Sequence, residues 1–364
     1  MAAAVATPLS SESIAAHDYL KARLASHPAS SINSSSFQIP VIDISPSYSN
    51  SIADRQAVAS QIRSACLNSG FFQIVNHGID QQACDGILEQ ARRFFHELPI
   101  EKREKLHIKY SGFFRGWEPA DSTSLYADEG EEGAGGETKD GFNWGYEERL
   151  DPTGGDGKYV EVDGSQGNKN VWPKEEDLPG FFEGIKEYYS KALQLARHLF
   201  RVFALALNLP ESYFDSKMTH PGGIARLIHY PPQVPQQETT KEIGLNAHSD
   251  YECFTILLCS SAPGLEVLSP TNEWVSVVPA KGALVVNVAD FLMRWTNGQF
   301  KSTVHRVVSK TERERYSVPL FFSINYDEKI ETLPSCTSDD NPSKYPPITA
   351  GQYVLDRLRA TLKE

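Results

Sequence analysis

The chain has 364 residues, and 40% of them are hydrophobic, which is enough to supply a substantial buried core. It carries 35 basic and 47 acidic residues, a formal net charge of -12, and no basic patch offsets this excess. Because such a chain repels polyanions, nucleic acid is excluded as a partner. No apolar run approaches the roughly 20 residues that span a bilayer, so no membrane segment is expected.

The cysteines and the N-terminus bear on the cellular compartment. Five cysteines is an odd number and none lies in a CxxC motif, which favours reduced thiols over a disulfide framework. Residues 1–36 are rich in Ala and Ser and lack the basic start and apolar segment of a signal peptide. We therefore expect a flexible N-terminal extension at 1–36 and a cytoplasmic location.

Residues 37–117 are expected to form a mixed α/β region. Alternating apolar residues predict strands at 37–45 and 70–79, and helical spacing predicts a helix at 52–68 between them. A further helical pattern at 83–106 is interrupted by Pro99.

The composition changes at residues 118–172, which are rich in Gly and acidic residues and are expected to form a lid region around one aromatic strand, "FNWGYEE". Residues 173–364 begin with a long helix at about 178–207. Seven short β-rich runs follow, which predict an antiparallel sandwich or barrel, and the pattern at 348–362 predicts a closing helix.

A candidate metal site lies in "GLNAHSDYECFTILL". If this stretch is extended, His248 and Asp250 point to the same side and can reach one ion. His305, inside the β-rich run "STVHRVV", is the candidate for a third ligand. Two His and one carboxylate leave three positions of an octahedron free, as in non-haem Fe(II) oxygenases. The pair alone is weak, because it arises often by chance and a strand histidine is commonly a packed residue.

Arg315 and Ser317 also share one face of a predicted strand, "RYSVPLFF". A guanidinium beside a hydroxyl can bind a carboxylate with two parallel hydrogen bonds. Taken alone, the pair could equally be part of a surface ion pair at a strand edge.

Taken together, "NAHSDYECFTILL", "LVVNVADFLMRWTNGQFKSTVHRVV" and "RYSVPLFF" resemble the core of the Fe(II)/2-oxoglutarate-dependent dioxygenase superfamily, in its isopenicillin N synthase-like branch. "IPVIDIS" and "GFFQIVNHGI" are similar to the N-terminal part of that branch, and fungal members are the most similar. The resemblance implies an α+β fold with a double-stranded β-helix (jelly-roll) core and flanking helices.

The resemblance also implies roles for single residues. His248, Asp250 and His305 would bind the iron, and Arg315 and Ser317 would bind the distal carboxylate of 2-oxoglutarate. Tyr230, in "RLIHYPP", matches a tyrosine of that branch which bonds the same carboxylate or lines the substrate side, although a core tyrosine is the alternative.

The activity implied is a dioxygenase that uses Fe(II), 2-oxoglutarate and O2, with ascorbate as a possible reductant. Such an enzyme converts 2-oxoglutarate to succinate and CO2 while a small organic substrate is hydroxylated, cyclised or desaturated. Two alternatives stay open: an Fe(II) oxidase of the isopenicillin N synthase type that needs no 2-oxoglutarate, and a non-catalytic metal-binding jelly roll.

The substrate side is expected at the aromatic strand, where Phe142, Trp144 and Tyr146 share one face. An aromatic wall favours a small organic molecule, although ordinary packing of the strand is the alternative. If that face packs elsewhere, the wall is expected on the barrel strand near Phe321 and Ser323. A nucleobase, an amino acid and a specialised metabolite remain candidate substrates. A monomer or weak homo-oligomer is expected.

Overall fold

The computed structural model describes residues 37–120, 137–232, 243–260, 262–308 and 312–361. The predicted extension at 1–36 and residues 121–136 of the predicted lid region lie outside the described residues.

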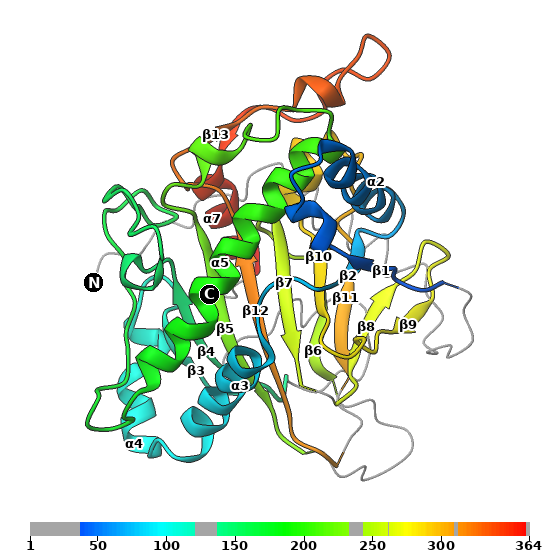
Figure 1. Cartoon of the computed structure of the whole chain (residues 1–364). Coiled ribbons are helices and arrows are strands. Elements are labelled where there is room, and N and C mark those ends of the chain that lie inside the picture. The colour runs from blue at the N-terminus through cyan, green and yellow to red at the C-terminus, as the bar shows by residue number, and fades with distance from the viewer. Residues whose placement is uncertain (1–36, 121–136, 233–242, 261, 309–311, 362–364) are drawn as a thin grey trace.

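The larger of two packed sheets has eight strands in the order β1-β2-β10-β7-β12-β5-β4-β3 (Figure 1). The strands are β1 Val41–Asp43, β2 Phe71–Val75, β3 Gly116–Glu118, β4 Asp140–Gly145, β5 Gly223–Tyr230, β7 Phe254–Cys259, β10 Leu284–Val288 and β12 Arg315–Phe322. Neighbouring strands are antiparallel except β1 and β2. β-Branched and aromatic residues dominate the central strands, as expected for a sheet buried on both faces.

The smaller sheet has four strands in the order β6-β11-β8-β9. The strands are β6 Ile243–His248, β8 Leu265–Leu268, β9 Trp274–Ser276 and β11 His305–Val308. Side chains from the two sheets meet in shared apolar clusters, one of which joins Phe71 and Val285 to Val267. From β5 to β12 the chain passes repeatedly between the two sheets, which is the winding of a jelly roll. The predicted α+β fold with a jelly-roll core is confirmed.

Helices flank this core. They are α2 Ile52–Asn68, α3 Gln81–His96, α4 Ile100–Arg103, α5 Phe181–Ala206, α6 Asp290–Trp295 and α7 Ala350–Thr361, and β13 Lys329–Ile330 pairs with β14 Ile348–Thr349 outside the core. The predicted helix at 52–68 is confirmed, and its N-cap Ser51 accepts a hydrogen bond from Asp54 N at 3.3 Å. None of the helices in the described ranges is long and apolar enough to cross a membrane.

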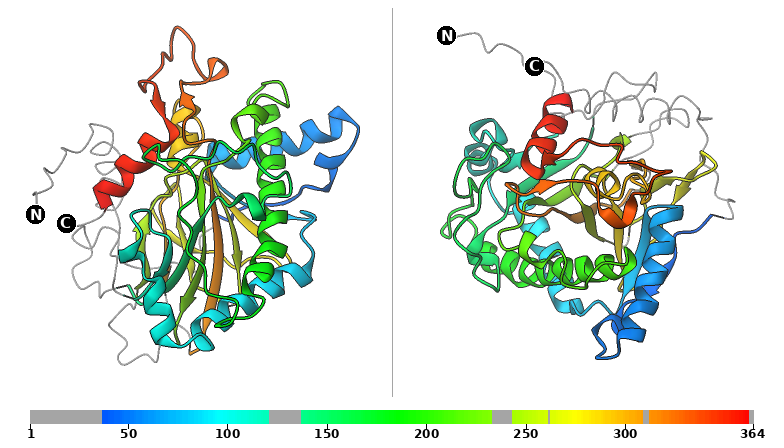
Figure 2. Two further views of the ribbon diagram at one scale, coloured as in Figure 1. Left: turned by 90° about the vertical axis from the view of Figure 1, so that its left-hand side faces the viewer. Right: turned by 90° about the horizontal axis from the view of Figure 1, so that it is seen from above.

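The outer face of the large sheet is covered by α5, with α2 and α3 beside it (Figure 2). The ring of Phe200 in α5 lies 5.1 Å from that of Phe254 in β7 and 5.9 Å from that of Phe322 in β12. Because the helices bury this face, the opposite face of the sheet is the one that lines the interior of the jelly roll.

The aromatic strand β4 packs toward the helices. Phe142 and Trp144 are fully buried and share one face of β4. The ring of Phe142 lies 4.6 Å from Phe94 in α3 and 5.5 Å from Phe181 in α5, and Trp144 lies 5.8 Å from Tyr189 in α5. This face of β4 is therefore part of the core between the sheet and the helices.

Strands from the predicted N-terminal region at 37–117 and from the predicted catalytic region at 173–364 belong to one sheet, because β2 pairs with β10. The division of the chain into 1–36, 37–117, 118–172 and 173–364 stays a prediction.

Replacement of Trp144 by Ala should destabilise the fold. The substitution leaves a cavity beneath α5, so the free energy of unfolding should fall by about 3–5 kcal/mol in urea denaturation. Tyr110→Ala is the control, since this aromatic side chain is 71% exposed, and it should shift that free energy by no more than about 0.5 kcal/mol. Unchanged stability in Trp144→Ala would contradict the packing of β4 on the helices.

Candidate metal centre

Three predicted ligands come from two paired strands and a turn. His248 is the last residue of β6 and His305 the first residue of β11, and the two lie opposite each other in the register of these strands. Asp250 lies beyond the end of β6, so the expectation that one strand carries both His248 and Asp250 is wrong. The turn between β6 and β7 brings the carboxylate to the histidines instead.

The three side chains converge in the interior. Asp250 Oδ1 lies 3.5 Å from His248 Nε2 and 3.6 Å from His305 Nε2, and all three residues are buried. Their ligand atoms all lie within 4.8 Å of one another. Two imidazole nitrogens and a carboxylate oxygen at this spacing can hold a metal ion.

Hydrogen bonds fix which atoms face that point. His248 Nδ1 bonds the carbonyl of Asn246 at 2.7 Å, and His305 Nδ1 bonds the carbonyl of Thr303 at 3.2 Å. A carbonyl only accepts, so each Nδ1 carries the proton and each Nε2 keeps its lone pair.

Asp250 is held in the same way. Its Oδ2 accepts hydrogen bonds from Thr255 Oγ1 at 2.5 Å and from Asn287 Nδ2 at 2.7 Å, which leaves Oδ1 toward the histidines. Such outer contacts orient metal ligands.

The protonation states of His248 and Asp250 favour metal binding. Burial, with a smaller contribution from the charge of His305, lowers the pKa of His248 to about 3. Burial alone would raise the pKa of Asp250, but the two histidines and the bonds from Asn287 and Thr255 outweigh it and hold that pKa below its usual value. A neutral imidazole and an ionised carboxylate are the forms that bind metals.

Arg315 and Ser317 lie at the start of β12 on the interior face, where the structure leaves the guanidinium short of partners. Arg315 is only 4% exposed, and its Nη2 donates to Cys259 Sγ at 3.5 Å. Its Nε and Nη1 are buried without a hydrogen-bond partner among the described residues. A buried cation with two unused donors is costly unless a ligand accepts them.

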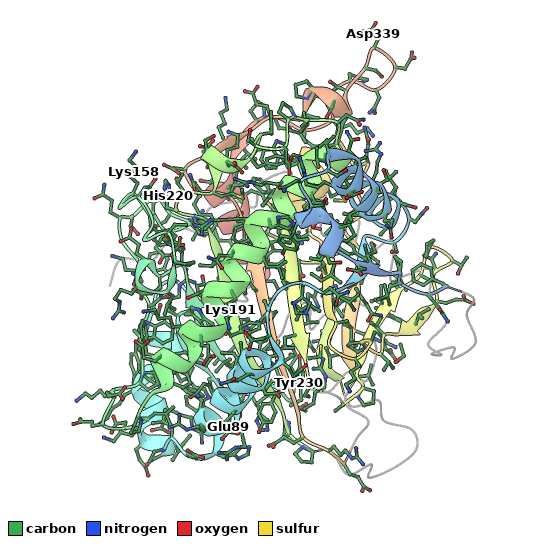
Figure 3. All side chains as sticks on the ribbon, in the orientation of Figure 1. Glu89, Lys158, Lys191, His220, Tyr230 and Asp339 are labelled. Carbon is green, nitrogen blue, oxygen red and sulfur yellow. The ribbon has the colours of Figure 1, made fainter. Side chains whose placement is uncertain are left out.

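Tyr230 lies beside this arginine. It is opposite Arg315 in the pairing of β5 with β12, and its ring centroid is 4.6 Å from the guanidinium carbon. Figure 3 labels Tyr230 at the end of β5. The residues predicted as a carboxylate clamp thus lie together in the described structure.

The predicted aromatic substrate wall is wrong. Phe142 and Trp144 point to the helices, and the Tyr146 hydroxyl donates to Asp151 at 2.7 Å. Alternation along a strand predicts which residues share a face, but it does not say which face is interior when both are buried. On β12, Phe321 shares the interior face of Arg315 and lies opposite Thr255, while Ser323 is buried just beyond the strand end.

The interior face of β3, β4 and β5, with the segment before β4, carries a charged wall that the sequence did not reveal. It consists of Glu118, Glu137, Lys139, Asn143 and Arg226. Glu118 accepts hydrogen bonds from Lys139 Nζ at 2.8 Å, from Asn143 Nδ2 at 3.0 Å and from Arg226 Nη2. Arg226 Nε also donates to Asn143 Oδ1 at 2.8 Å.

The charged wall reaches the metal centre. Glu137 Oε2 lies 3.2 Å from Lys139 Nζ, and Glu137 Oε1 accepts a hydrogen bond at 3.2 Å from the backbone N–H of Asn246. The carbonyl of the same Asn246 bonds Nδ1 of His248. Burial raises the pKa of Glu137. One indication of this wall is present in the sequence: the alternation of side chains along β4 places Asn143 on the face opposite Phe142 and Trp144.

Comparison with known proteins gives two family matches. Residues 221–324 match the 2OG-Fe(II) oxygenase superfamily, and residues 39–175 match the family described as non-haem dioxygenase in morphine synthesis N-terminal. A 2-oxoglutarate-Fe(II) type oxidoreductase of Emericella nidulans is 37% identical over 329 residues, which cover 89% of this chain and 89% of that protein.

Two solved structures are also similar. Neurospora crassa T7H in complex with alpha-KG and thymine has a TM-score of 0.76 and 26% identity, over 91% of this chain and 99% of that one. JOX2 in complex with 2OG, Fe and JA has a TM-score of 0.67 and 27% identity, over 94% of this chain and 93% of that one.

Removal of one support of Asp250 should weaken metal binding. Asn287→Ala takes away a hydrogen bond that orients the carboxylate, so Fe(II) affinity, titrated without oxygen, should fall about 10- to 100-fold. Asn68→Ala, at the exposed end of α2, is the control and should leave that affinity unchanged. Equal Fe(II) affinities in the two variants would show that Asn287 does not support the metal centre.

Proposed function

The chain belongs to the 2OG-Fe(II) oxygenase superfamily, and from this we propose that His248, Asp250 and His305 hold Fe(II). The protein is a 2-oxoglutarate-dependent iron oxygenase that acts on small molecules. We further propose that Arg315, with Ser317 and Tyr230 beside it, binds the distal carboxylate of 2-oxoglutarate.

The single observation that carries this assignment is the pair of unused donors on Arg315, in the same interior as the three converging ligands. A dicarboxylate whose other end reaches the metal would supply the missing acceptors. The non-catalytic jelly roll is disfavoured, because a module that only held a metal would have no use for this buried cation.

The chain's own groups position and shield the reactants. His248 Nε2, His305 Nε2 and Asp250 Oδ1 would hold the Fe(II), and a site with only three protein ligands would leave room for co-substrate and O2. Phe71, whose ring is 5.4 Å from that of His305, helps to keep water from this side. Fe(II), when bound, would activate O2, which is the oxidant: one oxygen atom enters succinate as 2-oxoglutarate loses CO2, and the other serves to oxidise the substrate.

We propose that the substrate is a compact polar molecule with a carbonyl or carboxylate oxygen, bound by Arg226 of the charged wall. Glu118 and Asn143 hold this guanidinium through Nη2 and Nε, and no hydrogen bond of its Nη1 to the described residues is present. Its side chain is 15% exposed, more than those of the buried Glu118 and Lys139. A pre-oriented donor in a dry site discriminates strongly between substrates. Hydroxylation, oxidative cyclisation or desaturation is the proposed outcome.

We also propose a cytoplasmic location. All five cysteines are free thiols and four of them are buried, which suits a reducing compartment.

Arg315→Leu tests the co-substrate site without any knowledge of the substrate. Loss of a charge-assisted contact of about 2–3 kcal/mol should weaken 2-oxoglutarate binding about 30- to 160-fold. The visible band of the Fe(II)·2-oxoglutarate chelate, titrated without oxygen, gives the affinity. Arg92→Leu, an exposed arginine of α3, is the control. An unchanged affinity in Arg315→Leu would show that 2-oxoglutarate does not bind at Arg315.

Arg226→Leu tests the substrate class. A screen of polar and apolar compounds by succinate release should select molecules with an accessible carbonyl or carboxylate oxygen. For these, kcat/KM in Arg226→Leu should fall about 30-fold or more, since a charged hydrogen bond is lost, while 2-oxoglutarate affinity is kept. Trp144→Phe, on the helix side of β4, is the control and should leave kcat/KM unchanged. Selection of purely apolar compounds would refute the role of Arg226.

A further inference from the structure

A second cluster of metal-ligating side chains lies on the outer face of the large sheet. His96 is the last residue of α3, His229 lies in β5, and Glu314 directly precedes β12. His229 neighbours Tyr230 and Glu314 neighbours Arg315, and successive strand residues point to opposite faces. The cluster therefore lies across the sheet from the proposed carboxylate clamp.

The three side chains share one point. Glu314 Oε1 lies 2.6 Å from His96 Nε2 and 2.7 Å from His229 Nε2, and the ligand atoms of all three lie within 4.8 Å of one another. The Tyr316 hydroxyl lies 2.9 Å from His96 Nε2. Two imidazoles and one carboxylate are a common protein donor set for zinc.

His229 is fixed in position. Its imidazole lies between the rings of Phe95 and Tyr316, with centroids 5.2 Å away on each side and interplanar angles of 28° and 24°. The residue is only 7% exposed, so its orientation is set by packing and not by solvent.

The other nitrogen of His229 has the environment of a metal-bound histidine. Nδ1 is buried without a hydrogen-bond partner among the described residues, and Asp140 Oδ2 lies 3.9 Å from it. Metal-ligating histidines commonly donate their second N–H to a carboxylate, which fixes the tautomer and makes the ligand more basic. A small approach of Asp140 would complete this arrangement.

We propose that His96, His229 and Glu314 form a second metal site, which binds Zn2+ independently of the iron centre. Zinc bonds of about 2.0–2.2 Å with tetrahedral angles separate neighbouring ligand atoms by about 3.3 Å, so the present contacts of 2.6 and 2.7 Å must open by about 0.6–0.7 Å. The side chains of His96 and Glu314 are 43% and 31% exposed and can make this shift. Water, or the Tyr316 hydroxyl, completes the coordination.

An ion at this position would join α3 to β5 and β12. These two strands carry Tyr230 and Arg315 on their other face. The second site would thus stabilise the strand pair that holds the proposed clamp, although Zn2+ binding itself does not depend on that clamp.

Metal analysis after equilibrium dialysis against micromolar free Zn2+ tests the site. The iron ligands also bind Zn2+, so His248→Ala with His305→Ala is used to remove that centre. The wild-type chain should retain two ions and the double variant one. Adding His96→Gln or Glu314→Gln to the double variant should abolish retention, and adding His107→Gln, a histidine outside the cluster, should not.

A thermal unfolding scan of each variant guards against misfolding. Zn2+ should raise the melting temperature of the double variant, and His96→Gln should remove this rise while leaving the melting temperature without metal unchanged. Two outcomes overturn the second site: no ion retained by the folded double variant, or an ion whose retention is indifferent to both His96→Gln and Glu314→Gln. The second outcome would mean that the ion binds elsewhere and that His96 and His229 only form hydrogen bonds with Glu314.

Discussion

The antiparallel pairing of β5 with β12 is the constraint on which both candidate sites depend. Its register sets Arg315 opposite Tyr230 on the interior face and Tyr316 opposite His229 on the outer face. A slip of β12 by one residue would turn its side chains to the other face of the sheet and send Arg315 toward α3. The packing of Phe322 on Phe200 opposes this slip, because the slip would take Phe322 away from the helix side.

The large sheet separates two chemically different environments. Toward α5 it presents aromatic and aliphatic side chains, and toward the interior it presents the guanidinium of Arg315 and the charged wall, facing the three candidate metal ligands. Burying charges is expensive unless they are paired and hydrogen-bonded. The charged wall meets this condition with two acidic and two basic side chains, joined by Asn143. Opposite charges hold this wall rigid, which suits a surface that must orient a substrate and exclude water.

Much of this arrangement could be predicted from the sequence, and the failures have physical causes. The helix at 52–68 and the short strands of the core follow from periodicity, and the set His248, Asp250 and His305 is implied by the resemblance of their motifs to a known family. The orientation of β4 could not be predicted, because both of its faces are buried and the alternation of side chains does not say which face points to the interior. The charged wall did not follow either, because Glu118, Lys139 and Arg226 come from separate segments that only strand pairing brings together.

The lone guanidinium of Arg315 makes ligand binding part of the energetics of folding. Without a carboxylate the native interior contains a cation whose Nε and Nη1 have lost water and gained no acceptor from the described residues. A dicarboxylate that fills this gap binds the native chain and not the unfolded one, and at a hundred times its dissociation constant it adds about 2.7 kcal/mol to the free energy of unfolding. The free energy of unfolding would then rise and fall with the concentration of the co-substrate, and a cell with little co-substrate would hold a less stable enzyme.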